Sequence, residues 1–337
     1  MSNVESRATW GDGWIKGLAA KFAEVENQAT MNYSLAIRSA LGVEKNKATS
    51  LFKEKTSDKA EERLTNKTGV GYPTLTGEGQ DYATDSRLPG YLAVFNFIKK
   101  TNSVEITEEE KDDRENDLQS KFDEGYDLNV SMQMEMDRSA FSLFTYAFTA
   151  QASLPADLSF YSDGKPLCSV GHPRKDGGTA QSNASATGIP LTETNLETGR
   201  QAIRRQLDDR GLPMQIGSGR LILLVPDSLE KNARIITASN LRNGTANNDL
   251  NIYDGIMTVI STKWINSQNS GSDTAWYLID SMFSPAIFYT RRGIRTSVYM
   301  DNKNKNTIYD ISARWQAGNK NWRGIWGSKG DGAAYSG

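Results

Sequence analysis

The sequence predicts a mixed α+β fold, and three patterns along its 337 residues carry that prediction. Residues 117–151 have apolar side chains at helical spacing and contain no proline. Beyond residue 190, short apolar runs alternate with capped helical segments. From Pro285 onward the chain is typical of successive β-hairpins. A chain of this length can bury a sizeable core and divides into about two domains.

The front of the chain lacks the pattern of a self-sufficient domain. Residues 1–59 are polar, with scattered aromatic side chains such as Trp10 and Trp14, and they are expected to form an extended arm that needs a partner surface. Glycine and proline then dominate residues 69–90, which indicates a long loop. Strands are expected at Tyr91–Ile98 and Ser103–Ile106. Loops this long inside a compact domain are usually functional.

The next segment favours one long helix. Thr107 and Glu110 match a capping box, and apolar residues recur at helical spacing from Asp117 to Gln151. Residues 128–136 also alternate like a strand, and polar residues at 129–133 interrupt the helical pattern. The helical spacing extends much further than the alternation, so a long helix is the prediction.

The rest of the chain supplies the sheet-forming segments. A turn-rich crossover at 162–190 precedes a helix that Thr194 and Glu197 are expected to cap. Asp227 and Glu230 are expected to cap a second helix, which runs to about Ser239. Strands are predicted at 220–225, 256–261, 274–280, 286–300, 306–317 and 322–326.

Charge is distributed unevenly although the net charge is only −2. Eight acids and two bases lie between Glu105 and Asp117, whereas Arg291–Gly337 holds nine bases and three acids. Such an arrangement suits head-to-tail contact between identical subunits. The longest aliphatic run, Leu221–Val225, is far too short to cross a bilayer, and Met1–Ile15 contains no secretory signal pattern.

Two residues allow a catalytic hypothesis. Cys168 and His172 are the chain's only cysteine and its only histidine, and they stand four residues apart in a glycine- and proline-rich segment. An imidazole that takes the thiol proton would activate the cysteine as a nucleophile. The alternative is a buried thiol beside a histidine that caps backbone carbonyls, and we favour it. With one residue of each type, multi-cysteine and multi-histidine metal sites are excluded, so neither metal nor cofactor is expected.

Several segments together resemble the major capsid proteins of Mu-like and related tailed phages. They occur in the expected order between Asp163 and Ser328, and the N-terminal half matches in layout only. The matching segments are Asp163–Leu167 with His172-Pro173 and Gly177–Thr179, Asp208–Pro213, Leu223–Pro226, Asn243–Asn251, Asp273–Leu278 and Trp322–Ser328.

The resemblance implies the Hong Kong 97-like phage capsid fold. It divides the chain into an N-terminal arm (1–59), an extended β-hairpin loop region (60–106), and a peripheral domain with a long spine helix (107–190). An axial domain (191–283) and returning peripheral strands (284–337) complete the fold. Covalently cross-linked relatives join a loop lysine to a neighbour's asparagine. Lys99 and Lys100 match no motif for that chemistry, so we expect no cross-link.

The implied function is structural. Copies would form pentamers and hexamers of an icosahedral head around double-stranded DNA, which they would contact weakly and nonspecifically. Portal and scaffold or decoration proteins are further expected partners, with assembly in the host cytoplasm and no membrane contact. The expected inter-subunit contacts are Trp10, Trp14, Arg87, Tyr91, Lys99, Lys100, Arg291 and Arg292. The alternatives are a glycan-acting hydrolase with paired carboxylates among its many aromatic residues, or a tail or decoration protein of the same virion.

Overall fold

The computed structural model describes residues 51–67, 69–87, 89–109, 118–156, 158–159, 163–238, 251–280, 282–283 and 286–335. The chain forms two compact units. Within the described residues, one unit, the spine unit, takes in 97–138 and 290–315. The other, the main unit, is built from the described parts of 51–96, 139–289 and 316–335.

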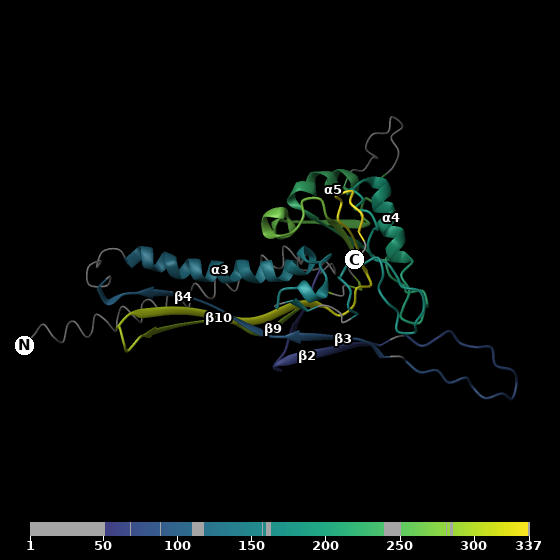
Figure 1. The fold of residues 1–337 in the computed structure, drawn as a ribbon, viewed down its shortest axis with the longest axis horizontal. Coiled ribbons are helices and arrows are strands. Elements are labelled where there is room, and N and C mark those ends of the chain that lie inside the picture. Colours follow the sequence, from purple (N-terminus) through teal and green to yellow (C-terminus); the bar gives the residue numbers. More distant parts are fainter. Residues whose placement is uncertain are drawn as a thin grey trace, which may run out of the picture. The chain divides into compact units, whose positions relative to one another are not determined.

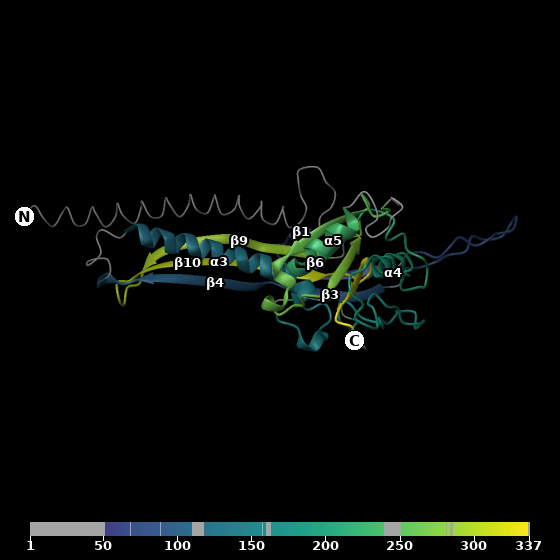
Figure 2. The ribbon, with the colours of Figure 1, turned by 90° about the horizontal axis from the view of Figure 1, so that it is seen from above.

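The spine unit combines one long helix with paired strands. Helix α3 (Leu118–Thr145) begins in this unit and extends beyond it. Strand β4 (Ile98–Ile106) pairs antiparallel with β10 (Thr307–Asn319), with Ile106 opposite Thr307 and Ile98 opposite Trp315. Strand β9 (Ala286–Met300) lies on the other side of β10 in the order β1-β9-β10-β4. Figures 1 and 2 show α3 running along one face of these strands.

Contacts between α3 and β4 fix which face the helix covers. Lys100 Nζ lies 2.5 Å from Glu135 Oε1, and Asn102 Nδ2 donates to Ser131 Oγ at 3.2 Å. Because side chains alternate along a strand, the even-numbered residues of β4 face the helix and the odd-numbered ones face away from it.

The main unit is organised around a four-stranded sheet in the order β11-β8-β6-β7. Its strands are β6 (Leu221–Pro226), β7 (Met257–Thr262), β8 (Trp276–Asp280) and β11 (Ile325–Ser328). Strands β6 and β7 are parallel, and the crossover between them includes α5 (Glu230–Thr237). Every residue of β6 is buried, as expected for a central strand.

Helix α4 (Glu193–Arg204) packs on this sheet through its buried Leu196, Gly199 and Ile203. A side chain at Gly199 would lie 2.8 Å from the Trp326 ring and 2.9 Å from Leu278, so only glycine lets the helix approach this closely. Short elements connect the larger ones: β5 (Leu158–Ser159) and the 3₁₀ turns Gln151–Ser153, Asp227–Leu229, Lys263–Ile265 and Ser267–Asn269.

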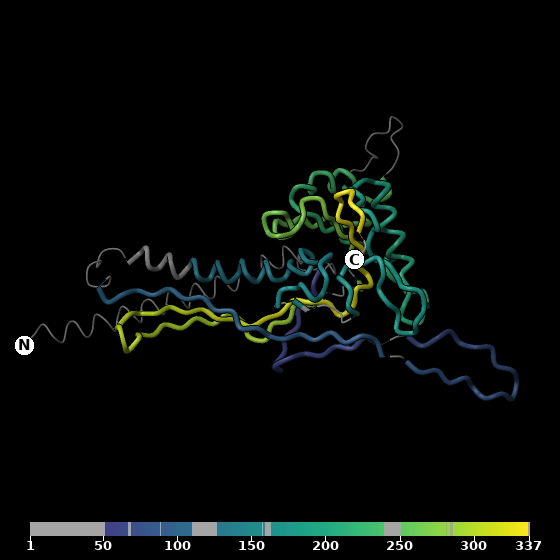
Figure 3. Tube along the Cα trace, viewed as in Figure 1, coloured from purple at the N-terminus to yellow at the C-terminus, as the bar shows by residue number. Residues whose placement is uncertain are grey.

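A two-stranded ribbon carries the long loop. Strands β2 (Glu61–Lys67) and β3 (Pro89–Asn96) pair antiparallel, with Glu61 opposite Asn96. Between them the chain travels out and back as a long excursion without regular secondary structure, visible in Figure 3. We refer to the described residues 69–87 of this excursion as the extended loop.

The long-helix prediction is confirmed from Leu118 to Thr145, and the helix is continuous through the polar residues at 129–133. Met132 and Met136 are buried one turn apart, whereas Met134 is 45% exposed, so the alternating pattern is a helical stripe with one outward methionine. The strand expected at 286–300 is confirmed as β9, and the strands expected at 220–225, 256–261, 274–280 and 306–317 are confirmed with small shifts at their ends. Strand β11 begins three residues later than expected.

The capping box predicted at Thr194 and Glu197 is wrong. Thr192 is the N-cap, because its backbone is extended and its side chain accepts a hydrogen bond from Asn195 N at 3.3 Å. Glu197 instead pairs with Arg200 one turn along the helix, at 2.7 Å. For the second helix, neither Asp227 nor Glu230 caps α5: its N-cap is Leu229, without a side-chain cap hydrogen bond. Glu110, the partner expected for Thr107, lies outside the described residues.

Strands β1 (Lys53–Thr56) and β2 were not predicted, because their charged sequences lack apolar alternation. Backbone pairing, rather than a buried side-chain face, holds β2 to its neighbour. Leu51 and Phe52, which the sequence placed in the arm, are buried within the chain. The Phe52 ring lies edge-on to Phe141 and Phe144 of α3, with ring centroids 5.9 and 6.1 Å apart.

Candidate assembly surfaces

The extended loop presents large apolar side chains to solvent. Tyr72 is 70% exposed, Tyr82 is 90% exposed and Leu75 is fully exposed, while Val70 is also more than half exposed. Exposed apolar side chains concentrated on one segment mark an interaction surface rather than a folded core. The sequence analysis identified the loop but not these residues, although aromatic and aliphatic residues within a glycine-rich stretch were a signal available to it.

The ends of the extended loop are joined to the turn at 208–213. Both Nη atoms of Arg210 contact the Asp85 carboxylate, at 2.7 and 2.9 Å, and Gly71 N donates to the same carboxylate at 2.6 Å. The Arg210 guanidinium is the main cause of an Asp85 pKa well below its usual value. This contact fastens the place where the loop leaves and re-enters the ribbon.

The turn at 208–213 is itself preorganised. Asp208 Oδ1 accepts hydrogen bonds from the backbone N–H groups of Arg210 and Leu212, both at 2.8 Å. Gly211 has φ +77°, a left-handed conformation that glycine adopts without a steric penalty. As a result, two adjacent side chains of the turn have different partners. Arg210 contacts the extended loop, and Asp209 contacts Arg323 at 3.0 Å.

The main unit contains two of the expected inter-subunit residues. Arg87 is exposed at the end of the extended loop. Tyr91 is partly buried in β3, and Lys175 Nζ lies 3.8 Å above its ring. Burial, with the nearby Asp163 and Asp209, raises the pKa of Tyr91.

Four other expected residues belong to the spine unit. Lys99 is exposed, whereas Lys100 contacts Glu135 and lies 5.3 Å from the Trp315 ring. Arg291 and Arg292 are partly buried, and Arg292 Nη2 donates to Ser312 Oγ at 2.9 Å. Trp10 and Trp14, the remaining two, lie outside the described residues.

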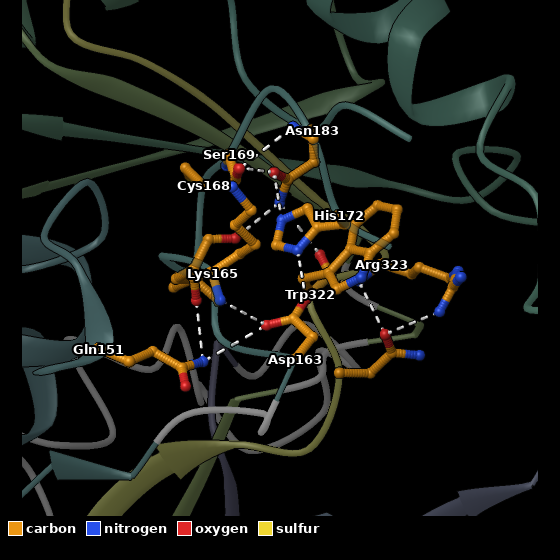
Figure 4. Close-up of polar contacts among 12 residues, drawn as sticks. Gln151, Asp163, Lys165, Cys168, Ser169, His172, Asn183, Trp322 and Arg323 are labelled. Atoms are coloured by element: carbon orange, nitrogen blue, oxygen red, sulfur yellow. Dashed lines mark hydrogen bonds and ion pairs between the residues drawn. The ribbon is translucent and has the colours of Figure 1, made fainter. Parts of the chain in front are cut away.

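The catalytic hypothesis for Cys168 and His172 is wrong, because both His172 ring nitrogens are engaged elsewhere. Nδ1 lies 2.5 Å from Asp163 Oδ2, and Nε2 lies 3.0 Å from Asn183 Oδ1. Asn183 also donates to Leu167 O at 2.8 Å, which turns its carbonyl oxygen toward the imidazole. Figure 4 shows this buried polar cluster. The favoured alternative holds for the buried thiol, but His172 binds these side chains rather than backbone carbonyls.

Cys168 is fully buried, and burial raises its pKa well above the usual value for a thiol. A buried thiol without an adjacent base is a weak nucleophile. The His172 ring instead stacks on Trp322, with centroids 4.3 Å apart, and the Arg323 guanidinium lies 4.5 Å from the same indole. The cluster therefore ties the crossover at 163–183 to the C-terminal segment.

No group of three or more histidine, cysteine or carboxylate side chains suited to a metal ion occurs among the described residues. In the same part of the chain, no helix is long and apolar enough to cross a bilayer.

Comparisons with known proteins address the identity of the chain. The profile of a family described as "Phage capsid protein" matches residues 92–328. No curated protein is similar enough in sequence to count as a relative.

Among solved structures, the capsid of Ralstonia phage GP4 has a TM-score of 0.52 at 11% identity, covering 84% of this chain and 88% of that one. The mature capsid of bacteriophage PhiM1 has a TM-score of 0.47 at 14% identity, covering 85% and 87%. The head of Helicobacter pylori bacteriophage KHP40 also has a TM-score of 0.47, at 10% identity, covering 81% and 87%.

The family match covers well over half of the chain, and the fold is the expected Hong Kong 97-like α+β fold. Neither a glycan-acting hydrolase nor a tail or decoration protein is supported by these matches. The chain belongs to the phage capsid protein family and is a structural major capsid protein, a component of a multimeric virion shell and not an enzyme.

Proposed function

We propose that copies of this chain assemble as pentamers and hexamers into an icosahedral head, and that the extended loop of each copy lies on a neighbour. The observation that carries this proposal is the exposure of Tyr72, Leu75 and Tyr82 on one segment. Burying such side chains against another copy contributes roughly 1.5–3 kcal/mol each, and a closed shell repeats that contact many times.

The enclosed cargo is proposed to be double-stranded DNA, held by weak nonspecific contact. A net charge of −2 supports this, because tight binding to duplex DNA requires many phosphate-neutralising contacts. Portal and scaffold or decoration proteins, and assembly in the host cytoplasm, are part of the same proposal. The DNA component predicts a shallow dependence of shell–DNA affinity on salt, and a steep dependence would contradict it.

The assembly proposal is tested by expressing the chain and measuring particle formation by electron microscopy and sedimentation. The triple variant Tyr72→Ser, Leu75→Ser, Tyr82→Ser should lose particles while its thermal unfolding stays unchanged, because these side chains contribute little to the core. Met134→Ser removes an apolar side chain that is 45% exposed on α3, outside the loop, and is the control. Normal particles from the triple variant would refute the role of the loop.

A further inference from the structure

The outer face of the spine-unit sheet, the face turned away from α3, carries a cluster of basic side chains. Lys99 of β4 is paired directly opposite Arg314 of β10, so both side chains project from the same face. Ser312 is two residues from Arg314 on β10 and therefore shares its face. Ser297 contacts Asp310 there, so Arg295, two residues before Ser297, shares the face. We call these three residues the basic face: Lys99, Arg295 and Arg314.

The basic face is not neutralised by ion pairs within the described part of the chain, although Asp310 and Glu105 lie on the same sheet face. None of its three side chains forms an ion pair with another described residue. Like charges directly opposite each other on adjacent strands are destabilising, and Lys99 and Arg314 are such a pair. These observations indicate a surface that is completed by an anionic partner.

The same unit also has a cluster of exposed acidic side chains at the far end of the sheet. Glu108 and Glu109 are exposed just beyond β4, where the sequence continues with further acids to Asp117. From Lys99 to Ile106 the extended strand spans about 23 Å at roughly 3.3 Å per residue. No side chain bridges that distance, so Glu108 and Glu109, which we call the acidic turn, cannot neutralise the basic face of their own copy.

We propose that the basic face binds the acidic turn at Glu108 and Glu109 of a second copy of this chain. The contact joins unlike surfaces, so it propagates head to tail and closes a ring when the rotation between copies permits. Duplex DNA is the less favoured occupant, because tight binding to a duplex requires many phosphate-neutralising contacts and this face offers only three bases. This inference rests on the proposed assembly. The contact would fix how neighbouring copies are oriented in the shell, because complementary charges determine the relative position of two surfaces more than they add affinity.

Charge reversal at exposed positions tests the contact without disturbing the fold. Lys99→Glu with Arg295→Glu reverses the basic face and leaves the hydrogen bond from Arg314 to Phe97 O in place. Glu108→Lys with Glu109→Lys reverses the acidic turn. The control is Lys231→Glu, an exposed lysine of α5 with no ion pair to a described residue. The measurement is the protein concentration at half-maximal assembly, followed by light scattering and sedimentation.

Each double variant should raise that concentration on the order of tenfold or more, corresponding to the loss of one charge-assisted contact per subunit. The chain carrying all four reversals should return to within about twofold of the wild type, because the charges are exchanged but still complementary. Mixing the two double variants should restore assembly at concentrations where neither assembles alone, which places the contact between copies.

The inference is overturned if either double variant assembles like the Lys231→Glu control, or if the fourfold variant is no better than its parents. A wild-type chain that forms no particles would instead count against the proposed function, so the two failures are distinguishable.

Discussion

Arg210 and Asp85 form a two-pronged ion pair between residues 125 positions apart in the sequence, with N–O distances of 2.7 and 2.9 Å. A planar guanidinium matches both carboxylate oxygens at once, which fixes direction as well as distance. The pair therefore holds the ends of the extended loop against the turn at 208–213.

Removing this pair should loosen the extended loop without unfolding the protein. Arg210→Gln is expected to speed proteolytic cleavage within residues 69–87 several-fold, because cleavage follows the population of open conformers. Thermal unfolding should change little, since the pair is exposed. Cleavage of the wild type should accelerate only in strong acid. Because the Asp85 pKa is lowered, the ion pair is intact at any pH above the usual pKa of an aspartate, and it opens only as the pH falls below that value. Equal cleavage rates in wild type and Arg210→Gln at neutral pH would contradict this role.

The stability of the protein should depend on pH in a way that can be assigned to Glu197. The Arg200 guanidinium, with Gln201 and the Tyr253 hydroxyl, lowers the Glu197 pKa to about 2. Its contribution to stability should be complete above about pH 4.5 and disappear as pH falls toward 2. The difference in melting temperature between wild type and Glu197→Gln should follow that curve. A difference that is constant from pH 7 to pH 2 would contradict the assignment.

Gly199 is predicted to be intolerant of larger side chains. Gly199→Val should lower the free energy of unfolding by about 1–3 kcal/mol, because the new side chain would overlap Trp326 and Leu278. Thr198→Val, at the neighbouring exposed position, introduces the same side chain facing solvent and should change stability by less than about 0.5 kcal/mol. Denaturant titration gives the free energy of unfolding of both variants. Equal changes in the two variants would show that helix propensity, rather than packing against Trp326 and Leu278, determines the effect at Gly199.

His172 and Asp163 should be energetically coupled. Either His172→Gln or Asp163→Asn leaves a buried partner poorly satisfied and should cost about 3 kcal/mol of unfolding free energy. The double variant should cost clearly less than the sum, because the second substitution removes a contact that the first has already broken. Additive effects in urea titrations would count against the pairing.

Cys168 should be chemically silent in the folded protein. Burial, together with the raised thiol pKa, keeps it from reacting with Ellman's reagent at pH 8, whereas the unfolded chain should release one equivalent of chromophore. Cys168→Ala should leave particle formation unchanged. Rapid reaction of the native thiol would show that the crossover at 163–183 opens in solution.

Local patterns were sufficient for the spine helix and most strands. The stripe through Met132 and Met136 predicted α3, and the apolar run at 221–225 predicted β6, because burial on a regular element imposes its period on the sequence. Strand β2 escaped notice because backbone pairing alone defines it. The helix cap was misplaced by two residues because Thr194 and Glu197 match the capping-box spacing, whereas the extended backbone of Thr192, which makes it the cap, leaves no such pattern in the sequence.

The sequence by itself determined the α+β class, the long helix, the loop and the uneven placement of charge, since each follows from spacing and composition over neighbouring residues. Tertiary structure alone decided that His172 binds Asp163 and Asn183 rather than Cys168, that Arg210 holds Asp85, and that Lys99 stands opposite Arg314. Except within the crossover around His172, these partners lie far apart in the sequence. Strand register and chain crossing bring such residues together, and neither leaves a local periodic signal.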